Sequence, residues 1–484
     1  MSSDRMILVS NRLPVTIDWN DGNLSLQPSA GGLVTALVPI IRTHGGCWVG
    51  STGTDYEPRL SAVLNNWRAT HNYSLHPVFM SAAEKECFYN GFSNQIIWPL
   101  FHGLSSRCHY DSAYWRSYRK ANDKFAQGLE GIWRSGDSVW IQDYHLMLMG
   151  ECLRHRGFHS RIAYFHHIPF PAPDVFEALP WRAELLSGLM HYDVIGFQTL
   201  RDVRNFTASL RRFLPETQIT HLGKNLQVTA NGLSAKVGRY PVSIDFDEFA
   251  APSNSTIDAT AAAIAQDAAG MKVVLGVDRL DYTKGILQRL HAFRMLLKTY
   301  SELRGSVTLF QIVIPSREDI PEYRQLKLDI EMSISEINGE YSTPGWIPIH
   351  YFHRSIPRDE LLGFYRAAHV ALVTPLRDGM NLVAKEFCAA RTDDRGVLVL
   401  SEFAGAAEEL GSGALLVNPN DADAVASSLY SALRMSESEQ ERRMNEMRFT
   451  IRTHDVFHWA CSFARDTAAI GDEATLMASR MAGD

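Results

Sequence analysis

The chain lacks the sequence features of a zinc-binding protein and those of a membrane protein. None of its six cysteines forms a CxxC pair, so zinc-site spacing is missing and reduced thiols in a cytosolic protein are predicted. No run approaches the roughly 18 apolar residues of a membrane span. The first residues, MSSDRMILVSNR, hold too short an apolar run for a signal peptide. We therefore expect a cytoplasmic protein that does not associate with membranes.

A surplus of basic residues is also missing. Forty-seven Lys and Arg stand against fifty-four Asp and Glu, which gives a formal charge of −7. A general nucleic-acid binder normally carries the opposite balance, so no nucleic-acid partner is expected. A phosphorylated ligand would have to be held by a local cluster of Arg and Lys side chains.

The chain does contain short apolar runs that alternate with segments of helical periodicity. Its 484 residues exceed the size at which one hydrophobic core stops growing. Buried strands alternating with amphipathic helices predict parallel sheets covered on both faces. We predict an α/β protein with two doubly wound Rossmann-like domains and a cleft between them. The runs cover residues 6–10, 138–144, 161–167, 193–199, 272–278, 307–315, 348–353, 370–375, 396–401 and 414–419.

The expected boundary between the domains follows the run YPVSIDFDEF. We place the N-terminal domain at residues 1–245 and the C-terminal domain at 246–454. An Ala/Ser-rich, weakly patterned segment covers 250–270. Residues 455–484 are expected to form a helix that packs back on the N-terminal domain.

Residues that directly follow strands are the ones to inspect in such domains, because ligands bind beyond the carboxyl ends of parallel strands. The first strand ends in SNR, which places Arg12 where the chain leaves the sheet. Gly31 and Gly32 then precede a helical segment, where bare N–H groups can approach a phosphate. A Gly-Gly turn is more often only a turn, so this motif by itself is ambiguous.

The N-terminal domain offers further polar and aromatic residues near strand ends. Tyr89 and Trp98 in FYNGFSNQIIWP could stack on a sugar or lie in the core. Asp143 ends one strand, and His166 and His167 end the next. Adjacent side chains on a strand point to opposite faces, so these histidines cannot share one metal ion. We expect no metal and one histidine that faces the cleft.

In the C-terminal domain, Arg279 and Lys284 lie five residues apart beyond a strand, in DRLDYTKG. They form either a solvated loop or a clamp for a diphosphate, which needs two close cations. Arg317 follows the next strand and could face a second anion.

The stretch TPLRDGMNLVAKEF runs from a strand through a charged turn directly into a helix. Asp and Gly are common at such corners because they tolerate unusual backbone angles. Alternatively, Asp378 and the N–H groups of Gly379 to Val383 form a ligand site. Glu386 on the first turns of the helix suits a diol, as a ribose-binding acid does in dinucleotide folds, or is an ordinary surface residue.

Together these motifs resemble those of the trehalose-6-phosphate synthases, which are retaining glycosyltransferases of the two-Rossmann-domain GT-B type. The resemblance runs from residue 10 to residue 410. The motifs in order are SNR, GGL, FYNGFSNQIIWP, DYHL, HIPFP, GFQT, DRLDYTKG, PSRED, INGEY, TPLRDGMNLVAKEF and SEFAGAAEEL.

The resemblance implies transfer of glucose from a nucleotide-glucose, usually UDP-glucose, to glucose 6-phosphate. Arg12, Tyr89 and Arg317 would hold the acceptor phosphate, and Trp48, Trp98 and Asp143 the acceptor sugar. Donor-binding residues would be Gly32, His167, Arg279, Lys284, Asp378, Gly379, Met380, Asn381, Leu382, Val383 and Glu386. Those closest to the chemistry would be Asp143, His167, Arg279, Lys284 and Asp378.

The family implies no metal and no cofactor, and its members often form dimers or tetramers. The run STGTDY departs from a tryptophan-containing run of many relatives. FHHIPFPAPDVFEALPWR also resembles the related glucosylglycerol-phosphate synthases. Glycerol 3-phosphate is therefore an alternative acceptor, GDP and ADP are alternative nucleotides, and a catalytically silent sugar-phosphate sensor is a further alternative.

Overall fold

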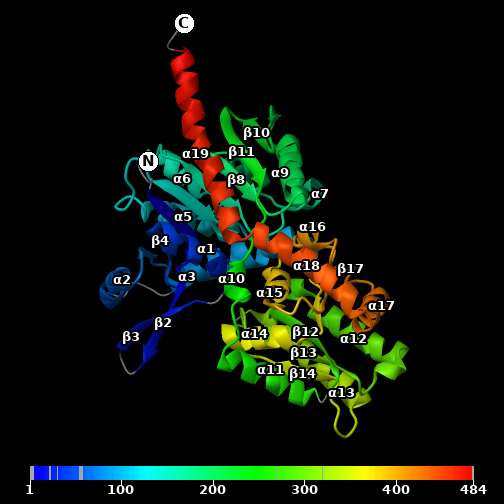
Figure 1. The fold of residues 1–484 in the computed structure, drawn as a ribbon. Coiled ribbons are helices and arrows are strands. Elements are labelled where there is room, and N and C mark those ends of the chain that lie inside the picture. Colours follow the sequence, from blue (N-terminus) through cyan, green and yellow to red (C-terminus); the bar gives the residue numbers. More distant parts are fainter. Residues whose placement is uncertain are drawn as a thin grey trace. The chain divides into compact units, whose positions relative to one another are not determined.

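The fold is a computed structural model that describes residues 5–20, 23–29, 31–53, 58–268, 270–318 and 320–481. The chain divides into two compact units (Figure 1). Unit 1 comprises Met1–Val242 and Val456–Asp484, and unit 2 comprises Ser243–Asp455. The observed division after Val242 lies three residues before the boundary expected after residue 245. Residues 54–57 of the STGTDY region lie outside the described residues.

Unit 1 is built on a nine-stranded sheet whose first six strands have the doubly wound order 3-2-1-4-5-6. Neighbours from β5 to β11 pair in parallel, and β10 and β9 extend the sheet in antiparallel fashion. In spatial order the strands are β5 (Tyr73–Val78), β4 (Gly46–Ser51), β1 (Met6–Arg12), β6 (Ser138–Gln142), β7 (Ile162–His166), β8 (Val194–Phe197), β11 (Leu233–Arg239), β10 (Asn225–Ala230) and β9 (Gln218–Leu222).

Strand β7 shows why both faces of this sheet are covered. Its residues are all buried. Tyr164 packs against Tyr192, which follows α8, whereas Phe165 contacts Phe463 of α19. Consecutive strand residues face opposite sides, so α8 and α19 cover opposite faces. The other elements of unit 1 are α1 (Gly32–His44), α2 (Pro58–Thr70), α3 (Ala82–Lys85), η1 (Glu86–Ile97), α4 (Trp98–Phe101), η2 (Ser105–Arg107), α5 (Ser112–Gln127), η3 (Tyr144–Leu146), α6 (Met149–His155), α7 (Pro173–Phe176), α8 (Arg182–Leu189), α9 (Leu200–Phe213) and the hairpin of β2 (Val15–Asn20) and β3 (Asn23–Pro28).

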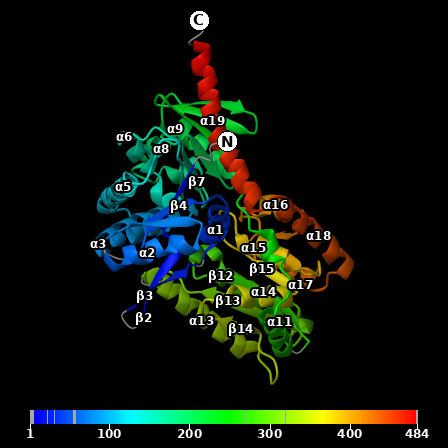
Figure 2. The ribbon, with the colours of Figure 1, turned by 60° about the vertical axis from the view of Figure 1, so that its left-hand side comes forward.

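The last helix, α19 (Val456–Met481), belongs to unit 1 although it follows the whole of unit 2 in sequence (Figures 1 and 2). Phe463 has no exposed surface and contacts the ring of Trp140 on β6. Asp466 accepts hydrogen bonds from Asn225, Lys236 and Tyr240 at 2.9–3.1 Å. The helix is therefore fastened to the sheet by an apolar contact and by a polar cluster.

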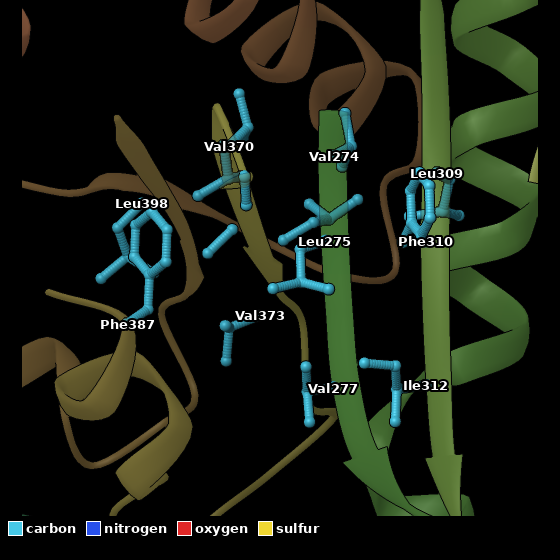
Figure 3. Close-up of a cluster of buried hydrophobic side chains, with 14 of the residues drawn as sticks. Val274, Leu275, Val277, Leu309, Phe310, Ile312, Val370, Val373, Phe387 and Leu398 are labelled. Carbon is cyan, nitrogen blue, oxygen red and sulfur yellow. The ribbon is translucent and has the colours of Figure 1, made fainter. Parts of the chain in front are cut away.

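Unit 2 has a six-stranded parallel sheet in the order 3-2-1-4-5-6. Figure 3 shows Leu275 of β12 among apolar side chains from the neighbouring strands, with Val370 on one side and Phe310 on the other. These strands are buried on both faces, which explains their continuous apolar runs. In spatial order they are β14 (Ile349–Phe352), β13 (Val307–Ile314), β12 (Lys272–Arg279), β15 (Val370–Val373), β16 (Val397–Ser401) and β17 (Leu415–Val417).

The segment 250–270 was expected to be weakly patterned, and most of it is a helix, α11 (Ser255–Asp267). Asn254 caps it by accepting from the N–H groups of Thr256 and Ile257. Ile257 and Ile264 are its buried residues, and α11 packs on α14. The remaining elements of unit 2 are α10 (Phe246–Phe249), η4 (Tyr282–Lys284), α12 (Ile286–Thr299), η5 (Ser301–Leu303), α13 (Pro321–Tyr341), α14 (Arg358–Ala367), α15 (Leu382–Ala390), α16 (Ala407–Leu410), α17 (Ala422–Leu433) and α18 (Glu437–Thr453).

The predicted α/β class with two doubly wound Rossmann-like domains is confirmed. Every predicted strand run overlaps an observed strand, from β1 at residues 6–12 to β17 at 415–417. Within the described ranges, no helix has both the length and the apolar composition needed to cross a membrane.

Candidate active site

The parallel part of each sheet has one place where its strand order reverses, and predicted site residues follow the strands there. In unit 1 this is the point between β1 and β6, where Arg12 ends β1 and Asp143 follows β6. In unit 2 it lies between β12 and β15, where Arg279 ends β12 and Asp378 follows β15. Ligands of doubly wound folds bind outside the carboxyl ends of the strands at these switch points.

A pocket lies beside the end of β1 in unit 1. The guanidinium carbon of Arg12 lies 5.4 Å from the centre of the Tyr89 ring, within the range of a cation–π contact. Arg12 is exposed and Tyr89 is half-buried. The structure thus brings these two predicted acceptor-binding residues together. The described residues that line the pocket are Asn11, Arg12, Ser51, Gly53, Met80, Lys85, Phe88 and Tyr89.

Tyr89 is held by an uncommon backbone conformation. It belongs to η1, a π-helix of 12 residues, and π-helical turns occur frequently at functional sites. The tyrosine ring stacks on His145, with ring centres 5.7 Å apart and planes 12° from parallel. Gly91 lets the helix approach α5, because a Cβ there would lie 2.7 Å from the ring of Tyr114. The ring of Tyr89 is therefore fixed from two sides, by Arg12 and by His145.

Asp143 has a strained backbone at the end of β6. Its φ of 72° and ψ of 168° are unusual for a residue with a side chain, and such strain costs about 1–3 kcal/mol. The backbone N–H of Asp143 donates to the carbonyl of Phe165 at 2.8 Å. The backbone N–H of His167 donates to Oδ1 of Asp143 at 3.2 Å. These bonds across the ends of β6 and β7 hold the carboxylate at the switch point.

The two adjacent histidines face opposite sides, as the strand alternation predicts. His166 is fully buried beside Phe101 and Phe170. His167 is half-buried, and its Nε2 lies 2.8 Å from Oε1 of Gln142. Burial lowers the pKa of each imidazole to about 3. His167 is therefore neutral at physiological pH, and with Nε2–H donating to Gln142 its Nδ1 is an acceptor.

The expectation for Trp48 is corrected by the structure. Its side chain has no exposed surface, and its indole N–H donates to Oγ of Ser10 at 2.8 Å. A side chain enclosed in the core cannot contact a sugar, so Trp48 is a core residue of β4. Ser51, which ends the same strand, lines the pocket instead.

Two other predicted site residues of unit 1 differ in how far they are exposed. Trp98 is 5% exposed and packs on His102 and Tyr144, so only its edge reaches the surface. Gly32 is exposed and is the first residue of α1. Its position fits the predicted approach of an anion to a helix N-terminus.

Three cations surround one buried carboxylate in unit 2. Burial acts to raise the pKa of Asp281, but the charges of Arg317, Arg279 and Lys284 and a bond from the Thr283 N–H outweigh it and lower that pKa. Nη1 of Arg317 lies 3.4 Å from Oδ2 of Asp281. Asp281 is thus a fixed anion that holds a group of positive side chains at the end of β12.

Arg317 reaches Asp281 through a left-handed backbone conformation, with φ of 54°. Its Nη1 also donates to the hydroxyl of Tyr323 at 2.6 Å. Arg317, Asp143 and Asn381 are all predicted site residues with positive φ, and non-glycine residues with positive φ are uncommon. Of these three, Asp143 and Asn381 follow strands that border the two switch points, whereas Arg317 follows β13.

Lys284 and Asp378 form an ion pair with Nζ 2.5 Å from Oδ2. Asn381 donates from Nδ2 to the same oxygen at 3.1 Å. Between η4 and α12, Gly285 has a φ of 63°, and a Cβ there would lie 2.3 Å from the carbonyl oxygen of Thr374. This close approach brings Lys284 beside the turn that carries Asp378.

The turn after β15 presents backbone N–H groups at the start of α15. Asn381 caps the helix by accepting from the N–H of Ala384 at 3.2 Å. The N–H groups of Leu382 and Val383 have no hydrogen-bond partner among the described residues. They lie at the positive end of the helix, where an anion or a polar ligand is stabilised.

A second segment fixes the shape of this turn. Gly405 donates to the carbonyl of Asp378 at 3.2 Å, and Ala406 donates to that of Met380 at 2.8 Å. A Cβ on Gly405 would lie 1.9 Å from the carbonyl oxygen of Gly379, so the contact requires glycine. Met380 itself is 4% exposed and lies in the core, which leaves its backbone as the group available to a ligand.

Glu386 lies one turn into α15 and is only partly exposed. Its Oε2 accepts from the hydroxyl of Tyr365 at 2.7 Å. Burial raises its pKa, although the bond from Tyr365 acts in the opposite direction. The alternative that Glu386 is an ordinary surface residue does not fit this environment, and its free carboxylate oxygen can accept from a diol.

Sequence reasoning missed Lys85, Ser51 and Asp281. The serine ends β4 beside the end of β1, so the strand-end rule could have identified it. Asp281 lies inside the motif DRLDYTKG, from which only the cations Arg279 and Lys284 were predicted as site residues. Lys85 has no such signal, because it precedes a π-helix whose phase the sequence does not reveal.

Two doubly wound units with cations and a helix N-terminus at their switch points have the architecture of the GT-B glycosyltransferases, and the solved structures that the chain resembles are enzymes of this class. The chain belongs to glycosyltransferase family 20, whose sequence model matches residues 4–469. A trehalose-6-phosphate synthase of Mycolicibacterium smegmatis is 41% identical over 476 residues, which are 96% of this chain and 93% of that protein. A bifunctional trehalose-6-phosphate synthase/phosphatase of Thermoproteus tenax is 41% identical over 474 residues, and the chain spans 63% of its length.

Solved structures show the same similarity. An α,α-trehalose-phosphate synthase (UDP-forming) from Burkholderia xenovorans, in complex with glucose-6-phosphate, superposes with a TM-score of 0.87 at 34% identity. That comparison covers 96% of this chain and 100% of the other. The E. coli protein bound with UDP-2-fluoro glucose has a TM-score of 0.85 at 34% identity and covers 96% and 99% of the two chains.

Proposed function

We propose that the chain is a retaining glucosyltransferase that moves glucose from UDP-glucose to glucose 6-phosphate and forms α,α-trehalose 6-phosphate and UDP. The observation that carries this proposal is the switch point of unit 2. There Arg279, the Lys284–Asp378 pair and the start of α15 offer cations, a carboxylate and N–H groups together. The names of the relatives support the choice of UDP, because the Dictyostelium discoideum and Burkholderia proteins are described as UDP-forming.

The donor is assigned to the following groups. The diphosphate is assigned to Arg279 and Lys284 of unit 2 and to Gly32 at the start of α1 in unit 1. Glu386 accepts from the ribose hydroxyls, and Leu382 and Val383 contact the nucleotide through their backbone. The transferred glucose is bound by His167, Asp378 and the backbone of Gly379, Met380 and Asn381. The neutral state of His167 fits this role, because its Nδ1 can accept from a sugar hydroxyl.

The reaction breaks the bond between glucose C1 and the diphosphate oxygen and forms a bond from C1 to the anomeric oxygen of the acceptor. The configuration is retained through an oxocarbenium-like state on one face of the sugar. The acceptor hydroxyl proton passes to the departing phosphate oxygen. Charge grows on that diphosphate, so fixed cations stabilise the transition state more than the ground state.

The acceptor is assigned to Arg12, Tyr89 and Arg317 for its phosphate, and to Trp98 and Asp143 for its sugar. The contact of Arg12 with Tyr89 supports this assignment, because it creates a cationic group with an aromatic wall beside a pocket. The strained backbone of Asp143 supports a role at the reacting sugar, since strain concentrates at functional sites. The scattered cysteines support a cytoplasmic location.

A matrix of donors and acceptors tests the proposal. UDP-, GDP- and ADP-glucose are each incubated with glucose 6-phosphate, glucose and glycerol 3-phosphate, and release of the nucleoside diphosphate is measured. We expect release from UDP-glucose that depends on glucose 6-phosphate. Preferred use of glycerol 3-phosphate would establish the alternative acceptor. An absence of release in every combination would favour the silent sensor.

The acceptor assignment is tested with Arg12→Ala. A charge-assisted contact contributes about 1.5–3 kcal/mol, so the KM for glucose 6-phosphate should rise at least about tenfold. The KM for the donor should not change, because the diphosphate has its own cations. Arg211→Ala, which removes an exposed arginine from α9 of the same unit, is the control. An unchanged acceptor KM in Arg12→Ala would remove Arg12 from the phosphate site.

A further inference from the structure

The pocket of unit 1 contains a second cation, Lys85. This residue ends α3 one helical turn before Tyr89, and both side chains line the pocket with Arg12. Residues four apart on a helix lie on the same side. The lysine is half-buried, so its stem is held by the surface while its ammonium remains accessible.

The two acidic residues next to Lys85 in the sequence already have partners. Glu84 accepts from the backbone N–H of Ser81 at 2.8 Å and pairs with Lys124 at 2.8 Å. Glu86 accepts from the side-chain amide of Asn90 at 2.7 Å. Across the described part of the chain, no carboxylate forms an ion pair with Lys85 or Arg12. Among the described residues, these two positive charges therefore share one pocket without a carboxylate partner.

From this arrangement we infer that Lys85 is a specificity-determining residue which, with Arg12, makes the pocket selective for the dianion of a phosphate monoester. The inference rests on the proposed function, since it concerns the phosphate of the same acceptor. A monoester carries nearly two negative charges at neutral pH, which two cations match. A neutral sugar gains nothing from either side chain.

Steady-state kinetics of Lys85→Met provide the test, because methionine retains the length and the helical preference of the side chain. We expect the KM for glucose 6-phosphate to rise about fivefold to thirtyfold, as for loss of one charge-assisted contact. The kcat, the donor KM and the KM for glucose should remain unchanged, and Lys85→Arg should restore most of the acceptor affinity. Lys120→Met, at an exposed position of α5, is the control.

Calorimetry separates this inference from the proposed function. Binding of glucose 6-phosphate and of inorganic phosphate is measured for the wild-type protein and for Lys85→Met without any donor. Weaker binding of both anions by the variant supports the inference even if no donor is turned over. Equal binding by both proteins, or an equal rise in KM for glucose and glucose 6-phosphate, would overturn it.

A second group of residues, on α6 and just after α8, has side chains that commonly bind metal ions. Glu151 and His155 lie four residues apart on α6, and His191 follows α8. Their ligand atoms all lie within 4.8 Å of one another. Nδ1 of His191 is 3.1 Å from the carbonyl oxygen of Ser187. A metal-binding histidine is typically oriented by such a bond from its other nitrogen, and here it leaves Nε2 for an ion.

We propose that these three residues form a surface site for Zn²⁺ or a similar divalent transition metal. Two imidazoles and one carboxylate are a common ligand set for zinc. Tetrahedral ligands at about 2.1 Å from the ion lie about 3.4 Å apart, and the exposed side chain of His155 can turn to close that distance. Glu151 forms no ion pair with any described residue, so its charge is available.

The test uses tag-free protein, because a polyhistidine tag would bind the same metals. Calorimetry with Zn²⁺ should show one equivalent that binds in the micromolar range or tighter. Glu151→Gln and His191→Ala should each weaken this binding at least tenfold, whereas His159→Ala, an exposed histidine of the same unit, should not. Absence of a stoichiometric site, or retention of it in the Glu151→Gln/His191→Ala protein, would overturn the proposal.

Discussion

The ammonium nitrogen of Lys284 lies 2.5 Å from Oδ2 of Asp378, and this pair joins the ends of β12 and β15. Both side chains are largely buried, with 12% and 14% of their surface exposed. An anion bound beside η4 competes with Asp378 for the same ammonium. If a diphosphate binds there, as proposed, its binding and the orientation of the Asp378 carboxylate are coupled through Lys284.

Replacement of Asp378 distinguishes its proposed contact with the reacting sugar from its ion pair with Lys284. We expect Asp378→Asn to lower turnover of UDP-glucose at least about a hundredfold, because a charged contact to the reacting sugar is lost. The affinity for UDP alone should stay equal or rise, since Lys284 loses its internal partner. Turnover assays measure the rate, and calorimetry measures the affinity for UDP. Asp423→Asn, at an exposed position of α17, is the control. Weakened UDP binding with intact turnover would contradict the assignment.

Arg279 is exposed at the end of β12 and can be removed with little structural change. Arg279→Ala should lower kcat about a hundredfold to a thousandfold, as for loss of a group that stabilises developing charge. Arg279→Lys should retain part of the activity, because lysine keeps the positive charge but lacks the paired N–H donors of the guanidinium. Lys298→Ala on α12 serves as the control. Wild-type turnover in Arg279→Ala would exclude the clamp from the mechanism.

Removal of divalent metal should leave glucosyl transfer unchanged. Arg279 and Lys284 are fixed cations at the proposed diphosphate site, so they can neutralise the charge that grows on the leaving group. The rate is measured after dialysis against excess EDTA and again after addition of Mg²⁺. A strict requirement for the added ion would show that the two side chains are insufficient.

The buried His166 predicts a pH dependence of stability. Burial lowers its pKa from the ordinary 6.5 to about 3, so below pH 6.5 the unfolded chain binds a proton that the folded chain does not. Stability should therefore fall as pH decreases from 6.5 toward 3, by up to about 1.4 kcal/mol per pH unit for this residue. His166→Phe should show a smaller decrease of Tm with acidification. Parallel Tm curves for the two proteins would refute the assignment.

Replacement of Trp48 tests whether this residue stabilises the core or contacts the substrate. Trp48→Phe removes the bond to Ser10 and part of the buried volume, so a loss of about 1–2 kcal/mol in the free energy of unfolding is expected. The KM for glucose 6-phosphate should not change. Chemical denaturation and kinetics measure the two effects. A raised KM with unchanged stability would restore the sugar contact that the structure excludes.

Much of the candidate site could be predicted because topology fixes it. Arg12, Asp143, Arg279 and Asp378 each follow a strand that borders a switch point, and parallel strands end on the same edge of a sheet. Trp48 was expected only from the family resemblance, and it lies inside β4 rather than after it. Strand β4 is buried on both faces, so no polar–apolar alternation shows which side chains face the core.

The missed elements have local physical reasons. The α11 segment contains mostly alanine and small polar residues, and only Ile257 and Ile264 are buried, so its apolar periodicity is weak. The π-helix η1 has hydrogen bonds from residue i to i+5, and the usual 3.6-residue pattern does not predict its phase. The place of Lys85 beside Arg12 depends on that phase and becomes visible only in three dimensions.

The return of α19 to unit 1 has a consequence for the order in which the protein can be made. During synthesis, residues before Val242 leave the ribosome before unit 2, whereas Phe463 and Asp466 leave it only after the whole of unit 2. Until then Trp140 and Phe165 lack the ring of Phe463, and Lys236 lacks the carboxylate of Asp466. Unit 2 is continuous in sequence and can complete its core earlier. The unit that begins folding first is therefore the last to finish.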